Sequence, residues 1–238
     1  MSSPYALKVT NDCMDWTPAS REFLCNLSPA VRRAFEDLSR PTAYPQGAFL
    51  FSQEEEPRGI FVVCKGRVKI SMTSADGRTV ILRIAKPGEV VGLYAVVSGE
   101  PYQANAETVD SSQVLFVKRQ DFLRFLLEQP EALLETAKQL GREYRIACEQ
   151  VRALSLTHSA PKKLATFLLN WTSGGQAVQK QLRARLTLTH EEIGQMIGTS
   201  RETVTRTFTD FRNQQLVMLK GSELVIRNRE ALAHFAEI

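Results

Sequence analysis

Short apolar runs separated by turn residues dominate the chain between residues 44 and 120. Glycines at positions 66, 77, 88 and 99 stand between these runs at intervals of eleven residues. Short strands with turn residues about every eight to twelve positions are typical of a β-sandwich or a β-barrel. The sequence therefore predicts a β domain whose strands are FLF (49–51), IFVV (60–63), VKISM (68–72), TVILRI (79–84) and VLFV (114–117).

The dipeptide Asp76-Gly77 separates the third and fourth of these runs. A two-residue turn that matches the twist of its flanking strands needs a positive φ at both central residues, and Asp-Gly meets that need. We therefore predict a tight β-hairpin at this point, with a positive φ at both Asp76 and Gly77.

A different period begins near residue 120 and continues to about residue 156. From Leu133 the apolar residues alternate at spacings of four and three: Leu133, Ala137, Leu140, Tyr144, Ala147, Val151 and Leu154. A heptad seam of this length favours a helix that pairs with a second copy of itself, and Pro130 suits its first turn. An amphipathic helix that lies on its own domain is the alternative. The sequence therefore predicts a dimerisation helix over residues 121–158, and a homodimer.

The segment His158-Ser159-Ala160-Pro161 interrupts this helical period. Pro161 disfavours helical backbone at the residue before it, so we expect a hinge and a domain boundary here. Beyond the hinge we expect a helix over 161–171, a strand near 186–188, two further helices and a terminal hairpin. The predicted fold is α+β. Its regions are a β domain over 1–120 (with 1–22 as a candidate flexible segment), the dimerisation helix over 121–158 and a C-terminal domain over 159–238.

The stretch THEEIGQMIGTSRETVTRTFTDFRNQQL has the spacing of a helix-turn-helix. Thr189 and Glu192 form a capping box that begins one helix, Gly198 ends it, and Ser200 caps the next. A short turn that contains glycine lets the second helix lie across the first. The predicted buried residues are Ile193, Met196 and Ile197 on the first helix, and Val204, Phe208 and Phe211 on the second.

With that face buried, Arg201, Glu202 and Arg206 fall on or beside the outward face of the second helix. A guanidinium can donate twice to guanine, and a carboxylate can accept from cytosine, so these three are the predicted base-reading residues. The hydroxyls and the lysine suited to DNA phosphates are Thr189, Ser200, Thr203 and Lys220. The alternative is a solvated surface helix with a Glu202–Arg206 pair. Residues 216–226 read as two strands around a Gly-Ser turn, which is the wing of a winged helix.

Charge is unevenly distributed along the chain. Residues 1–159 hold 19 Lys and Arg against 19 Asp and Glu, whereas residues 160–238 hold 11 against 7 and carry the whole net charge of +4. An asymmetry of this kind indicates a C-terminal region that faces a polyanion, although basic patches also occur on proteins that bind no nucleic acid.

Several other classes of protein find no support in the sequence. No apolar run is long enough to predict a membrane span, and the N-terminus lacks the features of a secretory signal, so we expect a cytoplasmic protein. The four cysteines form no C-x-x-C pair and the three histidines all fall in the last third, so we expect reduced thiols and no metal. No catalytic motif is present, so we expect no enzyme activity.

The stretch EEIGQMIGTSRETVTRTF, with the wing behind it, resembles the DNA-binding domain of the cyclic-AMP receptor protein/FNR family of bacterial transcription regulators. The stretch PGEVVGLYAVVSGEPYQANAET stands where this family carries its phosphate-binding cassette. The resemblance extends from about Leu24 to Ile238. It implies a β-roll sensor (a jelly roll like that of cyclic-nucleotide-binding domains), a dimerisation helix and a winged helix-turn-helix. It also implies double-stranded DNA with TGTGA-like half-sites in an inverted repeat, and RNA polymerase, as partners.

The cassette departs from the family pattern for cyclic nucleotides. The position of the ribose-binding Glu holds Leu93, and the position of the phosphate-binding Arg-Ser pair holds Tyr102-Gln103. Because a buried phosphate without a guanidinium is costly, we expect that cyclic AMP is not bound in the usual way. The residues of the candidate ligand pocket are Gly88, Glu89, Gly92, Leu93, Tyr102 and Gln103.

The other signals that this family senses do not match the sequence either. Cys13 and Cys25 lack the close spacing of an iron–sulfur ligand set, and no histidine precedes His158 to hold a haem. An unidentified ligand, thiol oxidation at Cys13 or Cys25, and constitutive DNA binding remain open as modes of control. The competing functional class is a regulatory module whose winged helix binds protein rather than DNA.

Overall fold

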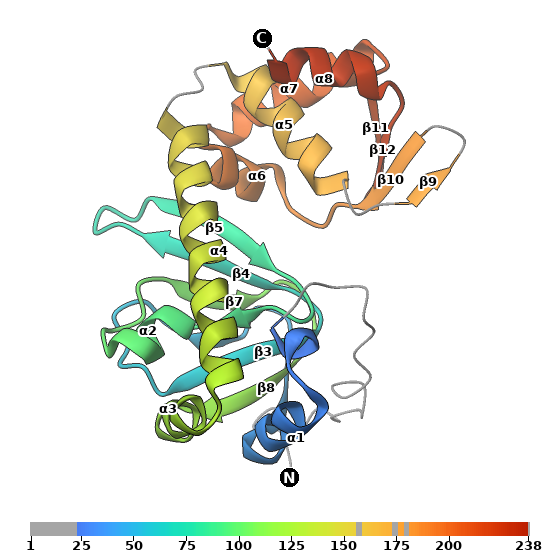
Figure 1. The fold of residues 1–238 in the computed structure, drawn as a ribbon. Helices are drawn as coiled ribbons and strands as arrows, with labels where there is room; N and C mark the ends of the chain where they lie inside the picture. The colour runs from blue at the N-terminus through green and yellow to red at the C-terminus, as the bar shows by residue number, and fades with distance from the viewer. Residues whose placement is uncertain (1–22, 156–158, 173–175, 179–180, 238) are drawn as a thin grey trace. The chain divides into compact units, whose positions relative to one another are not determined.

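The computed structural model describes residues 23–155, 159–172, 176–178 and 181–237 (Figure 1). Cys13 and the segment 1–22 that was expected to be flexible lie outside these residues. The chain divides into two compact units, Met1–Ala147 and Cys148–Ile238.

The first unit is a β-roll of two antiparallel four-stranded sheets, so the predicted β domain is confirmed. One sheet has the strand order β1-β8-β3-β6 and the other has the order β2-β7-β4-β5. The first sheet consists of β1 (Arg40–Tyr44), β3 (Gly59–Lys65), β6 (Val90–Val91) and β8 (Ser112–Lys118). The second consists of β2 (Phe49–Phe51), β4 (Val68–Thr73), β5 (Thr79–Ala85) and β7 (Asn105–Thr108). The sequence did not predict β1, β6 or β7.

Helices pack along one side of the roll (Figure 1). They are η2 (Leu24–Asn26), α1 (Pro29–Leu38), α2 (Leu93–Ser98), α3 (Arg119–Glu128) and α4 (Pro130–Ser155). One apolar core lies between these helices and the first sheet, and in it Phe35 and Phe122 meet edge to face. A second core fills the roll itself and includes Leu50, Phe61 and Val63. Full burial of such side chains stabilises the fold by about 1.5–3 kcal/mol each.

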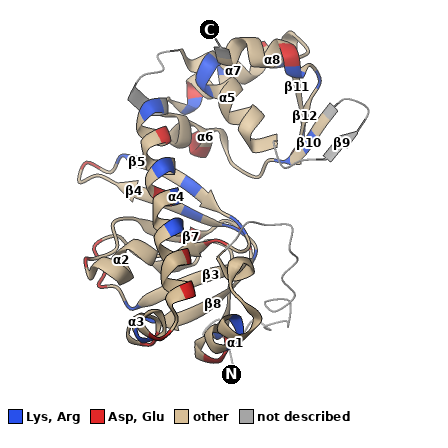
Figure 2. Ribbon diagram, in the orientation of Figure 1, with Lys and Arg blue, Asp and Glu red and all other residues tan. Residues whose placement is uncertain are grey.

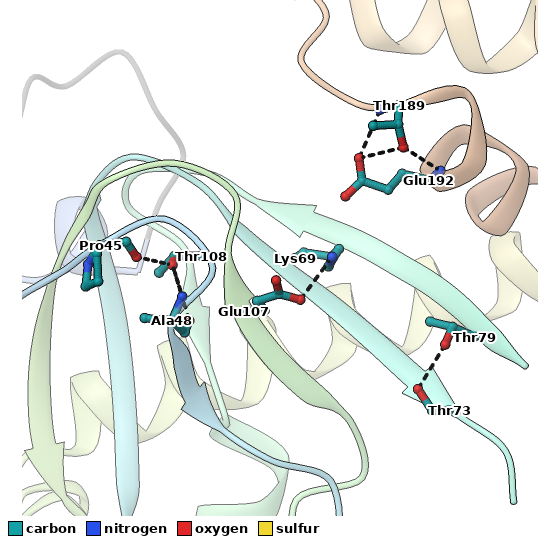
Figure 3. A network of polar contacts seen from close by, with 9 residues as sticks. All are labelled: Pro45, Ala48, Lys69, Thr73, Thr79, Glu107, Thr108, Thr189 and Glu192. Atoms are coloured by element: carbon teal, nitrogen blue, oxygen red, sulfur yellow. Dashed lines mark hydrogen bonds and ion pairs between the residues drawn. The ribbon is translucent and has the colours of Figure 1, made fainter. Parts of the chain in front are cut away.

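A buried threonine at the end of β7 ties this strand to the turn before β2. The Thr108 hydroxyl donates to the carbonyl of Pro45 at 2.6 Å and accepts from the amide of Ala48 at 2.9 Å (Figure 3). Because a buried hydroxyl is costly without partners, this pair of contacts fixes the turn before β2 against β7.

The predicted hairpin at Asp76-Gly77 exists, but its predicted turn geometry is wrong. Gly77 has φ +80°, whereas the described non-glycine residues with positive φ are Glu54 and Gln215, not Asp76. Amide-to-carbonyl bonds of 2.9 Å run from Ser74 to Arg78 and from Gly77 to Ser74. The connection is therefore a longer loop whose glycine alone takes the left-handed position, a common alternative to the two-residue turn.

The expected single helix over residues 121–158 is two helices, α3 and α4, which break at Gln129 before Pro130. Proline lacks the amide needed to continue a helix and disfavours helical backbone at the preceding residue. Along α4, Leu133, Tyr144 and Val151 of the predicted seam are 51%, 75% and 64% exposed.

Leu140, also predicted to belong to the seam, is half-buried and packs against the core of its own unit. Ala137 and Ala147 are exposed, and the side chain of Leu154 lies outside the described residues. The exposed residues form a stripe of their own with the same three-and-four spacing: Leu134, Ala137, Gly141, Tyr144, Cys148 and Val151. We call these six residues the α4 stripe. Basic and acidic positions both occur along the same helix (Figure 2).

The second unit is a winged helix-turn-helix. Its elements are α5 (Ala160–Thr172), β9 (Gln176–Val178), β10 (Gln181–Arg185), α6 (His190–Ile197), α7 (Arg201–Asn213), β11 (Val217–Lys220), β12 (Glu223–Ile226) and α8 (Arg229–Glu237). Its sheet has the order β11-β12-β10-β9. The strand predicted near 186–188 is wrong because β10 ends at Arg185. Leu186 and Leu188 are buried, at 4% and 7% exposure, in the segment after β10, so their apolar pattern reflects burial and not a strand.

Helix α8 was not predicted from the sequence. Its Leu232 is fully buried, and its Phe235 ring lies 5.2 Å from the ring of Phe211 on α7. This packing covers the side of α7 opposite to its exposed face.

Candidate nucleic-acid interface

Helix α6 begins with the predicted capping box. The Thr189 hydroxyl accepts from the Glu192 amide at 3.1 Å, and the Glu192 carboxylate accepts from the Thr189 amide at 2.9 Å (Figure 3). Gly198 ends the helix with φ +65°, and the Ser200 hydroxyl accepts from the Thr203 amide at 3.2 Å to begin α7. The helix boundaries predicted from the sequence are therefore confirmed.

The turn between α6 and α7 depends on a glycine that sequence reasoning did not single out. A Cβ atom on Gly194 would lie 2.7 Å from the carbonyl oxygen of Thr199, closer than real Cβ contacts allow. The absence of a side chain there lets the turn close against α6. The crossing of the two helices is fixed by this close approach together with their buried residues.

The predicted buried faces are largely confirmed. Ile193 and Ile197 on α6 are 0% and 6% exposed, and Val204, Phe208 and Phe211 on α7 are 1%, 6% and 1% exposed. Met196 is only half-buried, and its carbonyl accepts from the Gln150 side chain at 2.8 Å.

Arg201, Glu202 and Arg206 are all exposed; Glu202 and Arg206 lie on the face of α7 opposite its buried residues, and Arg201 lies beside that face in the first turn. The pKa of Glu202 is lowered by hydrogen bonds from its own amide and from Ser200 and by the charge of Arg201, so it is a ready acceptor. Within the described part of the chain no ion pair joins Glu202 to Arg206. Two guanidinium groups and a carboxylate thus stand at the beginning of α7, where a recognition helix meets base edges.

The residues predicted to position phosphates lie in different surroundings. The hydroxyls of Thr189 and Ser200 serve as helix caps, and Thr203 is half-buried beside Ser200, with the two hydroxyl oxygens 3.1 Å apart. Lys220 is exposed at the end of β11, next to Gly221, which has φ +57°. Lys220 therefore lies at the tip of the wing.

Sequence reasoning missed His190, the first residue of α6. Its Nδ1 lies 2.9 Å from the Thr205 hydroxyl, and its ring stacks on Phe208 with the centroids 5.1 Å apart and an interplanar angle of 12°. The only local feature of the sequence that could have indicated a role for His190 is its position directly after the Thr189 cap. The contact with Thr205 places His190 beside the exposed face of α7.

In the β-roll, two of the residues predicted to line the ligand pocket, Leu93 and Tyr102, are buried side chains. Gly88 and Gly92 have φ +91° and +82°, and Leu93, which follows Gly92, is 1% exposed. Tyr102 is also 1% exposed and stacks on Phe51 with ring centroids 3.9 Å apart. Gln103 points to solvent, in contrast to Tyr102.

The Tyr102 hydroxyl is satisfied by the backbone of β3. It donates to the carbonyl of Gly59 at 2.5 Å and accepts from the amide of the same residue at 3.2 Å. Burial raises the pKa of Tyr102, which keeps the hydroxyl protonated. An apolar ring and a neutral hydroxyl therefore occupy the position where the family pattern places a phosphate-binding cation.

Arg83 of β5 is one of the basic residues that reach the cassette. It forms ion pairs with Glu89, next to Gly88, and with Glu143 of α4 at 3.3 Å. The side chains of Arg83 and Glu143 are only 17% and 23% exposed. Sequence reasoning missed this connection because Arg83 and Glu143 are 60 residues apart.

The Glu143 carboxyl has a raised pKa. Burial is the largest influence and the charge of Glu89 adds to it, whereas Arg83, Gln139 and Arg142 oppose it. The ion pair that ties α4 to the cassette therefore contains a carboxylate that gains a proton more readily than usual.

Cys25 and Cys64 are half-buried and Cys148 is exposed, and none of the three is in a disulfide. Over the described ranges, no group of three or more His, Cys, Asp or Glu residues could hold a metal ion. Among the helices of the same ranges, none has the length and apolar character needed to cross a bilayer.

Two family models match the chain. The cyclic nucleotide-binding domain model matches residues 41–129, and the Crp-like helix-turn-helix domain model matches residues 162–235. The CRP-like cAMP-activated global transcriptional regulator of Mycobacterium tuberculosis (strain ATCC 25618 / H37Rv) is 27% identical over 224 residues, which cover 94% of this chain and 100% of that protein. The transcriptional activatory protein AadR of Rhodopseudomonas palustris is 28% identical over 194 residues, which cover 81% of this chain and 80% of AadR.

Solved structures share the fold. FixK2 from Bradyrhizobium japonicum superposes with a TM-score of 0.74 at 24% identity, over 83% of this chain and 96% of that chain. A CooA mutant from Carboxydothermus hydrogenoformans superposes with a TM-score of 0.72 at 21% identity, over 96% of this chain and 98% of that chain. With a β-roll matched by one model and a helix-turn-helix matched by the other, the chain belongs to the CRP/FNR family of bacterial transcription regulators, which bind DNA, act as dimers and are not enzymes.

Proposed function

We propose that this protein is a homodimeric regulator that reads an inverted-repeat DNA site through Arg201, Glu202 and Arg206. The observation that carries the proposal is their exposure in the first two turns of α7, at the end that the Ser200 cap holds in place. A guanidinium matches the two acceptors of guanine, and a carboxylate matches the donor of cytosine. The family resemblance adds TGTGA-like half-sites to this assignment.

The α4 stripe supports the homodimer. It carries Leu134, Tyr144 and Val151, which are 58%, 75% and 64% exposed, at heptad spacing with small residues between them. Exposed apolar residues at this spacing are stable when a second helix covers them. A dimer would present two α7 helices to half-sites separated by about one turn of DNA. Light scattering at micromolar concentration tests this, and a monomer mass would contradict it.

Selection of random DNA duplexes with the purified full chain tests the base-reading assignment. We expect enrichment of an inverted repeat whose half-sites change when Arg201 or Arg206 is replaced. The competing function, a winged helix that binds protein, predicts no enriched motif. We also expect a cytoplasmic protein, and the family resemblance implies RNA polymerase as a further partner.

We propose further that the β-roll does not bind cyclic AMP in the usual way, although the relative from Mycobacterium tuberculosis is named as cAMP-activated. Leu93 and Tyr102 supply neither the carboxylate nor the guanidinium of the family pattern, and Arg83 is already paired with two carboxylates. Burial of a phosphate without a paired cation is unfavourable.

Calorimetric titration with cyclic AMP tests this proposal, and we expect no saturable heat. Tight binding would overturn it. An unidentified ligand, oxidation of Cys13 or Cys25, and ligand-independent DNA binding are the remaining inputs. Duplex binding measured with and without cell extract, under reducing and oxidising conditions, distinguishes among the three.

A further inference from the structure

The contacts of His190 determine where its protons lie. The Thr205 hydroxyl lies 2.9 Å from the Arg201 carbonyl oxygen, to which it donates, and 2.9 Å from the Nδ1 atom of His190. A hydroxyl has a single hydrogen, so a threonine that donates to a carbonyl can only accept from the imidazole. His190 therefore carries a hydrogen on Nδ1.

The second ring nitrogen follows from this assignment. A neutral imidazole has one donor and one acceptor nitrogen, so the Nε2 atom of neutral His190 is an acceptor. An acceptor cannot bind a phosphate oxygen, which is itself an acceptor. Only the protonated ring, in which both nitrogens donate, can hold Nδ1 on Thr205 and offer Nε2 to a phosphate.

The surroundings of His190 favour the neutral ring in the free protein. Its pKa is lowered, first by burial of the ring and then by the positive charge of Arg201 on α7. The acidic groups in the first turn of its own helix are Glu191 and Glu192, and Glu192 is bound to Thr189 in the capping box. A DNA backbone beside this face would favour the protonated ring over the neutral one, because phosphates stabilise a nearby cation.

We propose that His190 contacts a DNA backbone phosphate and must gain a proton to do so, so that specific DNA binding takes up one proton. The inference rests on the proposed function, since the phosphate belongs to the duplex that α7 reads. The stacking of His190 on Phe208 and its bond to Thr205 hold the ring at the edge of the base-reading face. His190 thus adds a contact that the other predicted phosphate residues, three hydroxyls and a lysine, do not provide.

Calorimetric titration of the full chain with its selected duplex, in two buffers of different ionisation enthalpy, counts the protons taken up. We expect about one proton per bound protomer near neutral pH. Affinity should rise by up to about tenfold per pH unit as the pH falls from 7.5 to 6, as linkage requires for one proton.

The His190→Gln variant should remove both effects, because a glutamine amide can still donate to Thr205 but does not titrate. His234→Gln is the matched control, since His234 is exposed on α8, and it should leave proton uptake unchanged. Wild-type binding without proton uptake would overturn this inference and leave the base-reading proposal intact. Failure of the wild type to bind any duplex would overturn both.

Discussion

Replacement of Tyr102 by phenylalanine tests whether the bond to Gly59 holds the Tyr102 side chain in place in the β-roll. The substitution removes one oxygen atom and keeps the ring that stacks on Phe51. In the wild type that oxygen lies 2.5 Å from the carbonyl oxygen and 3.2 Å from the amide nitrogen of Gly59, and both residues are buried.

The expected cost follows from the two backbone groups that lose a partner. A buried polar group left without its hydrogen bond costs about 1–3 kcal/mol. Because the Gly59 backbone also takes part in the pairing of β3 with β8, part of this cost is relieved, so we expect Tyr102→Phe to destabilise the β-roll by about 1–3 kcal/mol in total.

Hydrogen exchange of β3 peptides, followed by mass spectrometry, measures this cost in the β-roll alone. Tyr94→Phe is the matched control: Tyr94 is 47% exposed on α2, and its change should stay within about 0.5 kcal/mol. An equally small effect of Tyr102→Phe would refute the reasoning. It would mean that the bond from Tyr102 to Gly59 does not hold the Tyr102 side chain in place in solution.

Three further predictions concern charged groups. Arg206→Ala should reduce discrimination at its guanine by about 1–3 kcal/mol in competition with single-base variants of the site, and equal loss on specific and scrambled duplexes would contradict base reading. Glu143→Gln should slow hydrogen exchange in α4 at neutral pH or leave it unchanged, because burial raises the pKa of Glu143 despite the charge of Arg83, so its ionised form costs stability; faster exchange would contradict this. Glu107→Gln is its matched control, since Glu107 pairs with Lys69 at 3.0 Å, at 28% and 17% exposure, between two strands (Figure 3). Burial alone would raise the pKa of Glu135, but hydrogen bonds from Arg142 and Asn26 outweigh burial and lower it from 4.5. The stability that Glu135 contributes should therefore be complete above about pH 4.5 and lost as the pH falls below it. Thermal unfolding of the wild type and of Glu135→Gln at pH 5 and pH 3.5 measures that difference.

Features that depend on a few neighbouring residues could be predicted from the sequence. The caps at Thr189 and Ser200 and the left-handed turn at Gly198 act over three or four positions, so both ends of α6 and the beginning of α7 were predicted where they are observed. The alternating runs of the β domain and the wing were predicted for the same reason, because strand periodicity is a local pattern. The exposed face of α7, with Arg201, Glu202 and Arg206, follows from helical geometry once the buried face is known.

Contacts between residues far apart in the chain follow from the packing of the tertiary structure. It turned Tyr102 inward onto Gly59, 43 residues away, and paired Arg83 with Glu143 across 60 residues. It also placed Leu140 in the core of its own unit, so that the exposed heptad stripe of α4 includes Leu134 and Cys148 instead. A contact of this kind depends on how sheets and helices pack, which leaves no periodic trace near either residue. For the same reason the bond between His190 and Thr205, which are 15 residues apart, could not be predicted from the sequence, because it forms only where α7 crosses α6.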